Sequence, residues 1–290
     1  YEISLPLSNV KENHFRVYAG PLSKETLERI DAIYSNALKN YDPNYSLSMS
    51  FHGIFSKFTE PFSQFLFILM KLFHSLTKSW GFSIILITIV FRLILYPLNA
   101  WQIKSSEKMK TLQPKMKSLE EKYKKDPKRL QMEKMKLFRE QGVNPFKGCF
   151  PVFIQFPFFI ALYNLLKNSF ELRGVSFIPG WIDNLSSPDV LFSWNTPIIF
   201  LGTAFHLLPF INAFFTYVQQ KVMTDQQGAA MTEDQKKQKQ MMTFFLPIMF
   251  LFITYNLPSG LNIYWISSTI LGILQWWIFN KKKSKIIQIK

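Results

Sequence analysis

A 20-residue apolar segment with one positive charge in its middle is the feature that most constrains the fold of this chain. Residues 82–101 read FSIILITIVFRLILYPLNAW, which is long enough for a helix to cross the hydrocarbon core of a bilayer. Arg92 lies at the centre, where an arginine costs about 2.5 to 3.5 kcal/mol on insertion scales. Such a side chain needs a polar partner or a water-filled cavity. The central question is therefore which group Arg92 contacts.

The overall composition is also that of a membrane protein. Of the 290 residues, 48% are hydrophobic and 17% are aromatic, and they gather in long runs. The net charge of +15 is typical of basic cytoplasmic loops, with contact to ribosomal RNA or anionic lipid as the alternative. Cys149 is the one cysteine, lies in an apolar segment and has no metal-ligand spacing around it. Because the chain begins at Tyr1 without a signal peptide, we expect it to be the C-terminal portion of a longer protein.

Residues 1–50 have the pattern of the end of a larger soluble domain. Residues 14–19 alternate as in a strand, and Ser23 is placed to cap a following helix. One strand and one helix cannot bury a core of their own. Residues 51–80 form a linker followed by an amphipathic helix over 61–79. Its narrow polar stripe favours a helix in the membrane interface, and a crossing helix is the alternative.

Long apolar runs predict five membrane-spanning helices, which makes the chain an all-α polytopic membrane protein. Lys and Arg are abundant in three of the segments outside these helices and scarce in the loop 169–196. The positive-inside rule therefore places residues 1–80 outside and the C-terminus inside. The predicted spans are 81–102, 144–168, 197–221, 241–257 and 261–280, and the predicted cytosolic segments are 103–143, 222–240 and 281–290.

Residues 103–143 have the pattern of a helical hairpin. Asp126 and Pro127 supply an N-cap and a first-turn proline for the second arm, and Pro114 is expected to kink or break the first. An apolar seam at three-to-four spacing runs along the first arm, which disfavours the alternative of a solvated spacer. The seam consists of Met109, Leu112, Met116, Leu119 and Tyr123.

Arg92 belongs to a polar stripe on the first predicted span. Thr88 lies one helical turn before it and Tyr96 one turn after it. Polar residues on other spans each have the more ordinary interpretation of a helix–helix hydrogen bond, but together with Arg92 they predict a water-filled concavity. These residues are Gln155, Asn212, Asn262 and Ser267.

The sequence carries no signature of catalysis or of cofactor binding. The five predicted spans contain no Asp or Glu, so a proton relay through His206 is disfavoured and that ring is expected to be packed or bonded to the backbone. Gly-rich phosphate loops, metal-ligand clusters and nucleophile–base motifs are missing. We therefore expect no catalytic residue, no metal and no cofactor, and a protein that is not an enzyme.

Three segments resemble, in order and spacing, the signature segments of the YidC family of membrane protein insertases. They are WGFSIILITIVFRLILYPL, NPFKGCFPVFIQFPFFIALY and LPSGLNIYWISS, and the resemblance extends over about residues 59–279. It implies a five-helix core around a hydrophilic groove that is open to the cytosol and to lipid. It also implies that Arg92 is the groove arginine and that Thr88 and Gln155 are polar groove positions. Tyr264 and Trp265 match an aromatic pair near the inserting segment, although the family often has two tyrosines there.

The same resemblance implies the function and the partners. An insertase and chaperone of this family inserts nascent inner-membrane proteins, alone or with the Sec translocon, and uses neither covalent chemistry nor a nucleotide. Ribosomes and membrane lipids are implied partners, DNA is not, and the location is the bacterial inner membrane. A secondary transporter with Arg92 as an anion site is the rival, disfavoured by the missing carboxylates and repeat; an assembly scaffold is a third. The insertase interpretation predicts that Arg92 faces an inward-open cavity, and neither lipid nor a salt bridge.

Overall fold

The computed structural model describes residues 24–35, 56–143, 150–224, 237 and 239–288, and the chain divides into two units, residues 1–49 and 50–290. In the first unit the helix predicted after Ser23 is confirmed as α1 (Lys24–Tyr34). The strand predicted over 14–19 lies outside the described residues.

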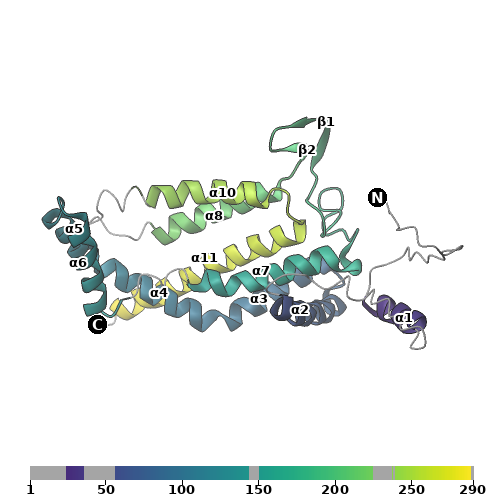
Figure 1. The fold of residues 1–290 in the computed structure, drawn as a ribbon, viewed down its shortest axis with the longest axis horizontal. Coiled ribbons are helices and arrows are strands. Elements are labelled where there is room, and N and C mark those ends of the chain that lie inside the picture. The colour runs from purple at the N-terminus through teal and green to yellow at the C-terminus, as the bar shows by residue number, and fades with distance from the viewer. Residues whose placement is uncertain (1–23, 36–55, 144–149, 225–236, 238, 289–290) are drawn as a thin grey trace, which may run out of the picture. The chain divides into compact units, whose positions relative to one another are not determined.

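The second unit is predominantly helical, and its helices α3, α7, α8, α10 and α11 run along one another (Figure 1). α11 packs against α3, α7 and α8, while α2 packs against α3 and α7. The described elements are α2 (Ser56–Thr77), α3 (Trp80–Ile94), α4 (Tyr96–Thr111), α5 (Gln113–Lys122), α6 (Pro127–Glu140), α7 (Phe150–Asn168), η4 (Phe170–Leu172), β1 (Phe192–Ile198), β2 (Gly202–Phe205), α8 (Leu208–Thr224), η5 (Met241–Phe245), α10 (Leu246–Thr254) and α11 (Ser259–Gln288).

Phe158 on α7 is the point at which four helices meet in the core. Its ring lies 4.1 Å from that of Phe91 on α3, 6.0 Å from Phe62 on α2 and 4.9 Å from Tyr264 on α11. Phe158 and Tyr264 are both about 1% exposed, so these contacts are fully desolvated. Aromatic contacts of this kind add to the stabilisation from buried area and fix how the helices are rotated.

The first predicted span is bent. α3 ends at Ile94 and α4 begins at Tyr96, with a 58° bend between them. Pro97 explains the bend, because it cannot donate a hydrogen bond to the carbonyl of residue 93 and it disfavours helical geometry at residue 96. No single helix in the described part of the chain is long and apolar enough to cross a membrane. Taken together, α3 and residues 96–105 of α4 have the length and composition that a crossing requires.

The third predicted span, 197–221, is wrong in its first half. Residues 192–205 form an antiparallel hairpin of β1 and β2, and helix α8 begins only at Leu208. Pro197 lacks a donor for a helix, and Phe200 and Gly202 both have a positive φ that no helix tolerates. The described residues are mostly helical, as predicted, but the all-α fold class missed the two-stranded sheet of β1 and β2.

The last two predicted spans differ from expectation in their bounds. The fourth begins as the π-helical turn η5, because Pro247 cannot donate to the carbonyl of Thr243 and the hydrogen-bond ladder shifts. The fifth, α11, continues to Gln288, so most of the segment predicted as a separate tail, 281–290, prolongs that helix.

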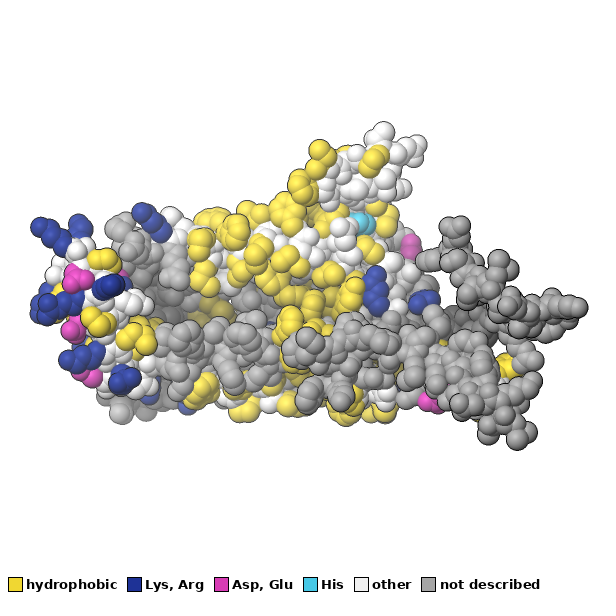
Figure 2. Space-filling view, viewed as in Figure 1, with side chains coloured by type: hydrophobic (Ala, Val, Ile, Leu, Met, Phe, Trp, Pro, Cys, Tyr) yellow, Lys and Arg dark blue, Asp and Glu magenta, His cyan; other side chains and the backbone are white. Residues whose placement is uncertain are grey.

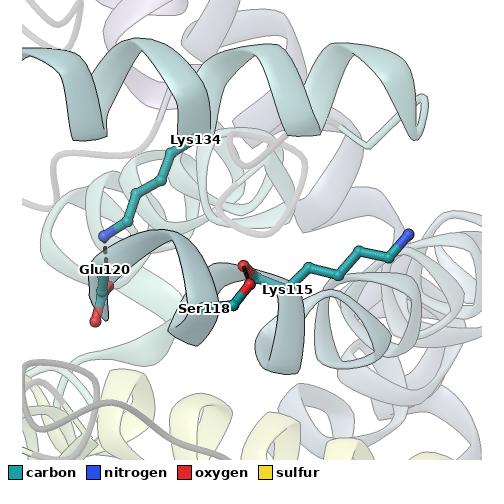
Figure 3. Close-up of polar contacts among 4 residues, drawn as sticks. All are labelled: Lys115, Ser118, Glu120 and Lys134. Carbon is teal, nitrogen blue, oxygen red and sulfur yellow. Dashed lines mark hydrogen bonds and ion pairs between the residues drawn. The ribbon is translucent and has the colours of Figure 1, made fainter. Parts of the chain in front are cut away.

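Helices α5 and α6 pack against each other within the segment predicted as a helical hairpin, 103–143, while residues 103–111 at its start belong to α4. Asp126 accepts a hydrogen bond from the backbone of Arg129 and caps α6, and the first arm breaks at Leu112, just before Pro114. Lys134 reaches from α6 to Glu120 on α5, as Figure 3 shows, and both side chains are four-fifths buried or more. Lys, Arg, Asp and Glu side chains cover this part of the surface in Figure 2.

One buried carboxylate organises the loop that precedes α8. Asp189 is 1% exposed, and its Oδ2 accepts hydrogen bonds from Trp181 Nε1 at 2.9 Å and from the backbone N–H groups of Leu207 at 2.7 Å and Leu208 at 3.1 Å. The last two are donors that the start of a helix leaves without partners. The ring of His206 bonds through Nδ1 to the carbonyl of Asp189, which confirms the backbone bond predicted for that histidine.

Replacing Asp189 by Ala removes the acceptor of three hydrogen bonds in a buried site. We expect Asp189→Ala to lower the free energy of unfolding by about 3 kcal/mol, because desolvated donors are left without partners. Chemical denaturation of the purified protein in mixed micelles measures this change. Asp183→Ala is the matched control: Asp183 lies exposed in the same loop and accepts one bond from Gly180. Equal effects of the two variants would contradict the role assigned to Asp189.

Candidate functional site

Arg92 is held between α3 and α11 by one serine. Its Nε donates to Ser268 Oγ at 3.1 Å, and its Nη2 donates to Ser268 Oγ at 2.8 Å and to the Ser268 carbonyl at 2.6 Å. Ser268 is 3% exposed, and the arginine itself is half-buried. The guanidinium thus finds neutral acceptors on the neighbouring helix, which compensate only part of the loss of hydration.

Gly272 supplies the space in which Arg92 meets α11. A Cβ atom at this position would lie 3.2 Å from Nη2 of Arg92 and 2.8 Å from Nε2 of Gln219 on α8. Glycine therefore allows two polar side chains, from two different helices, to approach the same turn of α11.

A second polar contact lies beside the first. Gln155 on α7 donates from Nε2 to the Tyr264 hydroxyl at 2.9 Å, and it lies 3.5 Å from Ser268 Oγ. Tyr264 is 1% exposed. Helices α3, α7 and α8 therefore each bring a polar side chain to the same face of α11.

That face was only partly visible in the sequence. Tyr264, Ser268 and Gly272 are spaced by four residues, so they share one side of α11. Ser267, which the sequence predicted at this polar surface, is the neighbour of the serine that bonds to Arg92. Neither Gln219 nor Gly272 was predicted as a residue of the site. The signal that finds Ser268 and Gly272 is a tyrosine, a serine and a glycine at i, i+4 and i+8, in a chain that carries one arginine within an apolar helix.

The remaining predicted site residues lie outside this contact. Thr88 is fully buried, and its hydroxyl donates to the carbonyl of Ile84 at 2.7 Å. Trp265 packs its ring 5.3 Å from Phe159 and 4.6 Å from Phe250, between α7 and α10. The water-filled groove expected around these residues stays a prediction.

Three further polar side chains are buried where α8 meets η5 and α11. Asn212 and Thr216 lie on one face of α8, Thr243 lies on η5, and all three are 7% exposed or less. Among the residues that the structure describes, none offers a hydrogen bond to the amide of Asn212 or to either hydroxyl. Each buried group without a partner costs about 1–3 kcal/mol, so this interface is polar and is left unsatisfied by the described residues.

The described part of the chain holds ion pairs away from Arg92. Two ion pairs in this part of the chain join Lys71 with Glu171 and Lys134 with Glu120, and neither includes Arg92. The same described part contains no group of three or more His, Cys, Asp or Glu side chains placed to hold a metal ion.

The model of the family described as 60Kd inner membrane protein matches residues 72–286, which include every residue of this site. The chain belongs to this family. A membrane protein insertase YidC of Chlamydia caviae is 50% identical over 282 residues, which cover 97% of this chain and 35% of that protein. YidC of Chlamydia muridarum is 51% identical, with 97% and 36% covered, and that of Treponema denticola is 35% identical, with 96% and 47% covered. The resemblance to the YidC family is thereby confirmed.

A solved structure also resembles this chain. The crystal structure described as active YidC insertase with the first transmembrane domain resolved is 27% identical, with a TM-score of 0.54, and the match covers 81% of this chain and 51% of that one. The chain spans about a third of the length of its chlamydial relatives and just under half of its treponemal relative.

The hydrogen bond between Gln155 and Tyr264 is testable by a double-mutant cycle. We expect Gln155→Leu and Tyr264→Phe to show a coupling energy of about 1 kcal/mol in unfolding experiments, because each removes the same neutral hydrogen bond. Tyr163 provides the control: it lies two turns away on α7, and Gln155→Leu with Tyr163→Phe should be additive. A coupling near zero for the first pair would contradict the contact.

Proposed function

We propose that this chain is the membrane-embedded insertion module of a YidC insertase, and that Arg92 attracts the polar tail of a nascent membrane protein. The single observation that carries the proposal is the set of contacts of Arg92. Its guanidinium bonds to Ser268, a neutral residue, and no described carboxylate forms an ion pair with it. A half-desolvated cation of this kind retains a strong attraction for an anionic group that comes from outside the chain.

The proposed mechanism moves a polar tail partway across the membrane without covalent chemistry. Arg92, Gln155 and Gln219 provide donors along the α11 face, and acidic or polar tail residues exchange their water for these donors. Asn212, Thr216 and Thr243 extend the polar surface between α8, η5 and α11, and their unpartnered atoms support hydration or substrate contact there. The hydrophobic segment of the substrate then moves into lipid, where burial of its apolar area drives release.

The proposed topology follows the charge distribution. The bent pair α3–α4, then α7, α8, η5–α10 and α11 form the five crossing elements, around a groove open to the cytosol and to lipid. The α5–α6 hairpin and the lysine-rich end of α11 lie in the cytosol, where they are available to ribosomes or to the Sec translocon. Residues 1–50 are the end of a periplasmic β-domain, and α2 lies in the outer interface. Its exposed apolar residues Phe65, Ile68, Leu72 and Leu76 support contact with lipid.

Substitutions of Arg92 test the proposal. In the full-length protein, we expect Arg92→Leu to slow translocation of a single-span reporter with an acidic tail by about tenfold or more, because the attraction between the charges is lost. Arg92→Lys keeps the charge but not the fork on Ser268, so it should retain most of the activity. A protease-protection assay in cells depleted of the native insertase measures the rate.

Two controls separate this function from its rivals. Arg173→Leu removes an exposed arginine from the loop after α7 and should insert the reporter normally. A reporter with an uncharged tail should depend little on Arg92. Normal insertion of the acidic reporter by Arg92→Leu would overturn the proposal. Flux of a small anion through reconstituted protein would favour a transporter, and loss of insertion only on deletion of the α5–α6 hairpin would favour a scaffold.

A further inference from the structure

The β1–β2 hairpin exposes an unusually apolar tip. Ile199 is 81% exposed, Phe200 is 78% exposed and Ile198 is 48% exposed. They form a tight turn, closed by a hydrogen bond from the N–H of Leu201 to the carbonyl of Ile198 at 3.2 Å. Contiguous exposed apolar residues in a folded protein mark a surface that another molecule or a membrane covers.

The turn also holds its phenylalanine in a strained conformation. Phe200 has a φ of 69°, in the left-handed region that bulky residues rarely adopt and that glycine fills in most turns of this kind. A strained, exposed aromatic residue at the end of a hairpin points to a contact that compensates for the strain.

The hairpin is fixed to the helices and is not a free loop. The hydroxyl of Tyr255 donates to the carbonyl of Ala204 at 3.0 Å. The ring of Phe205 stacks 5.0 Å from Phe192 across the strands and 5.1 Å from Phe210 on α8. The direction of the tip is therefore set by α8 and by the end of α10.

The tip continues an apolar stripe on α10. Four exposed side chains repeat at three-to-four spacing along η5 and α10, and the last of them, Phe252, lies 5.8 Å from the ring of Phe200. Figure 2 shows hydrophobic side chains gathered over the region that α8 and α10 occupy in Figure 1. The stripe consists of Met241, Phe245, Ile248 and Phe252, all more than half exposed.

Charge distribution selects lipid as the occupant of this surface. No Asp, Glu, Lys or Arg occurs between Asp189 and Lys221, a run that covers both strands and most of α8. Trp194 lies within the hairpin, with its indole N–H bonded to the carbonyl of Gly202 at 2.9 Å, and tryptophan with a satisfied N–H is typical of the membrane–water interface. A partner protein in water is ordinarily met by a surface with a polar, charged rim, which this run does not provide.

We propose that the β1–β2 hairpin is a membrane anchor, whose tip at residues 198–201 inserts into the outer leaflet of the bilayer beside α10. The inference rests on the proposed topology, in which α10 faces lipid and the hairpin lies on the outer side. It assigns the hairpin a separate role: it holds the outer ends of α8 and α10 at a fixed depth while a substrate passes between helices.

Spin-label accessibility in the full-length protein tests the proposal. In a background with Cys149→Ser and any other cysteine replaced, a nitroxide is attached to Phe200→Cys, to Ile248→Cys on α10 or to Asp183→Cys in the charged loop. The protein is reconstituted in vesicles of phosphatidylethanolamine and phosphatidylglycerol. Collisions with oxygen, which concentrates in hydrocarbon, are compared with collisions with a water-soluble nickel chelate.

We expect the oxygen-to-chelate ratio at position 200 to match that at 248 and to exceed that at 183 several-fold. Adding Ile199→Asp should lower the oxygen-to-chelate ratio at position 200 several-fold. Adding Thr203→Asp at an exposed position of β2 should leave that ratio unchanged. A ratio at 200 equal to that at 183 overturns the anchor. Protection of 200 from both reagents also overturns it, because a protein then covers the tip. An aqueous ratio at 248 contradicts the proposed topology instead, so the two failures are distinguishable.

Discussion

The cost of keeping Arg92 away from bulk water is the constraint on which the arrangement of α3, α7, α8 and α11 depends. A guanidinium between apolar helices needs acceptors, and here both the hydroxyl and the carbonyl of Ser268 serve as acceptors. A Cβ atom at residue 272 would lie 3.2 Å from Nη2 of Arg92, so glycine gives this side chain room at the surface of α11. Arg92 thus joins α3 to α11 by polar contacts, while the aromatic contacts of Phe158 join the same helices on their apolar side.

At the other end of these helices, the polar contacts between elements are made by backbone carbonyl groups and not by a charged side chain. The turn between α10 and α11 is fixed to the loop before β1, since the hydroxyl of Ser259 donates to the carbonyls of Asn184 and Ser187. Gly260 follows, where a Cβ atom would lie 3.1 Å from the carbonyl of Leu185. These hydrogen bonds hold the turn against the loop, although Oδ1 of Asp189 and Oδ1 of Asn262 nearby are buried without a hydrogen-bond partner among the described residues.

The sequence predicted elements better than contacts. The α5–α6 hairpin, its Asp126 cap and the apolar seam were readable because caps and periodicity act over a few residues. The pairing of Gln155 with Tyr264 joins two residues that the family resemblance had named, but Arg92 bonds to Ser268 and not to its neighbour Ser267. One residue rotates a side chain by about 100° around a helix, so composition alone cannot choose between them.

The secondary structure between Asp189 and Lys221 also could not be predicted from composition alone. This segment is apolar and free of charge throughout, and such a run is compatible with a strand or a buried helix. The choice between strand and helix depends on a few residues. Pro197 has no backbone donor, and Phe200 and Gly202 turn the chain with a positive φ. The carboxylate of Asp189 accepts hydrogen bonds from the first N–H groups of α8. A helix that started ten residues earlier would leave that buried carboxylate without its backbone donors, at a cost of several hydrogen bonds. The hairpin is therefore the consequence of where α8 is capped, and its apolar tip follows from a composition suited to lipid in either conformation.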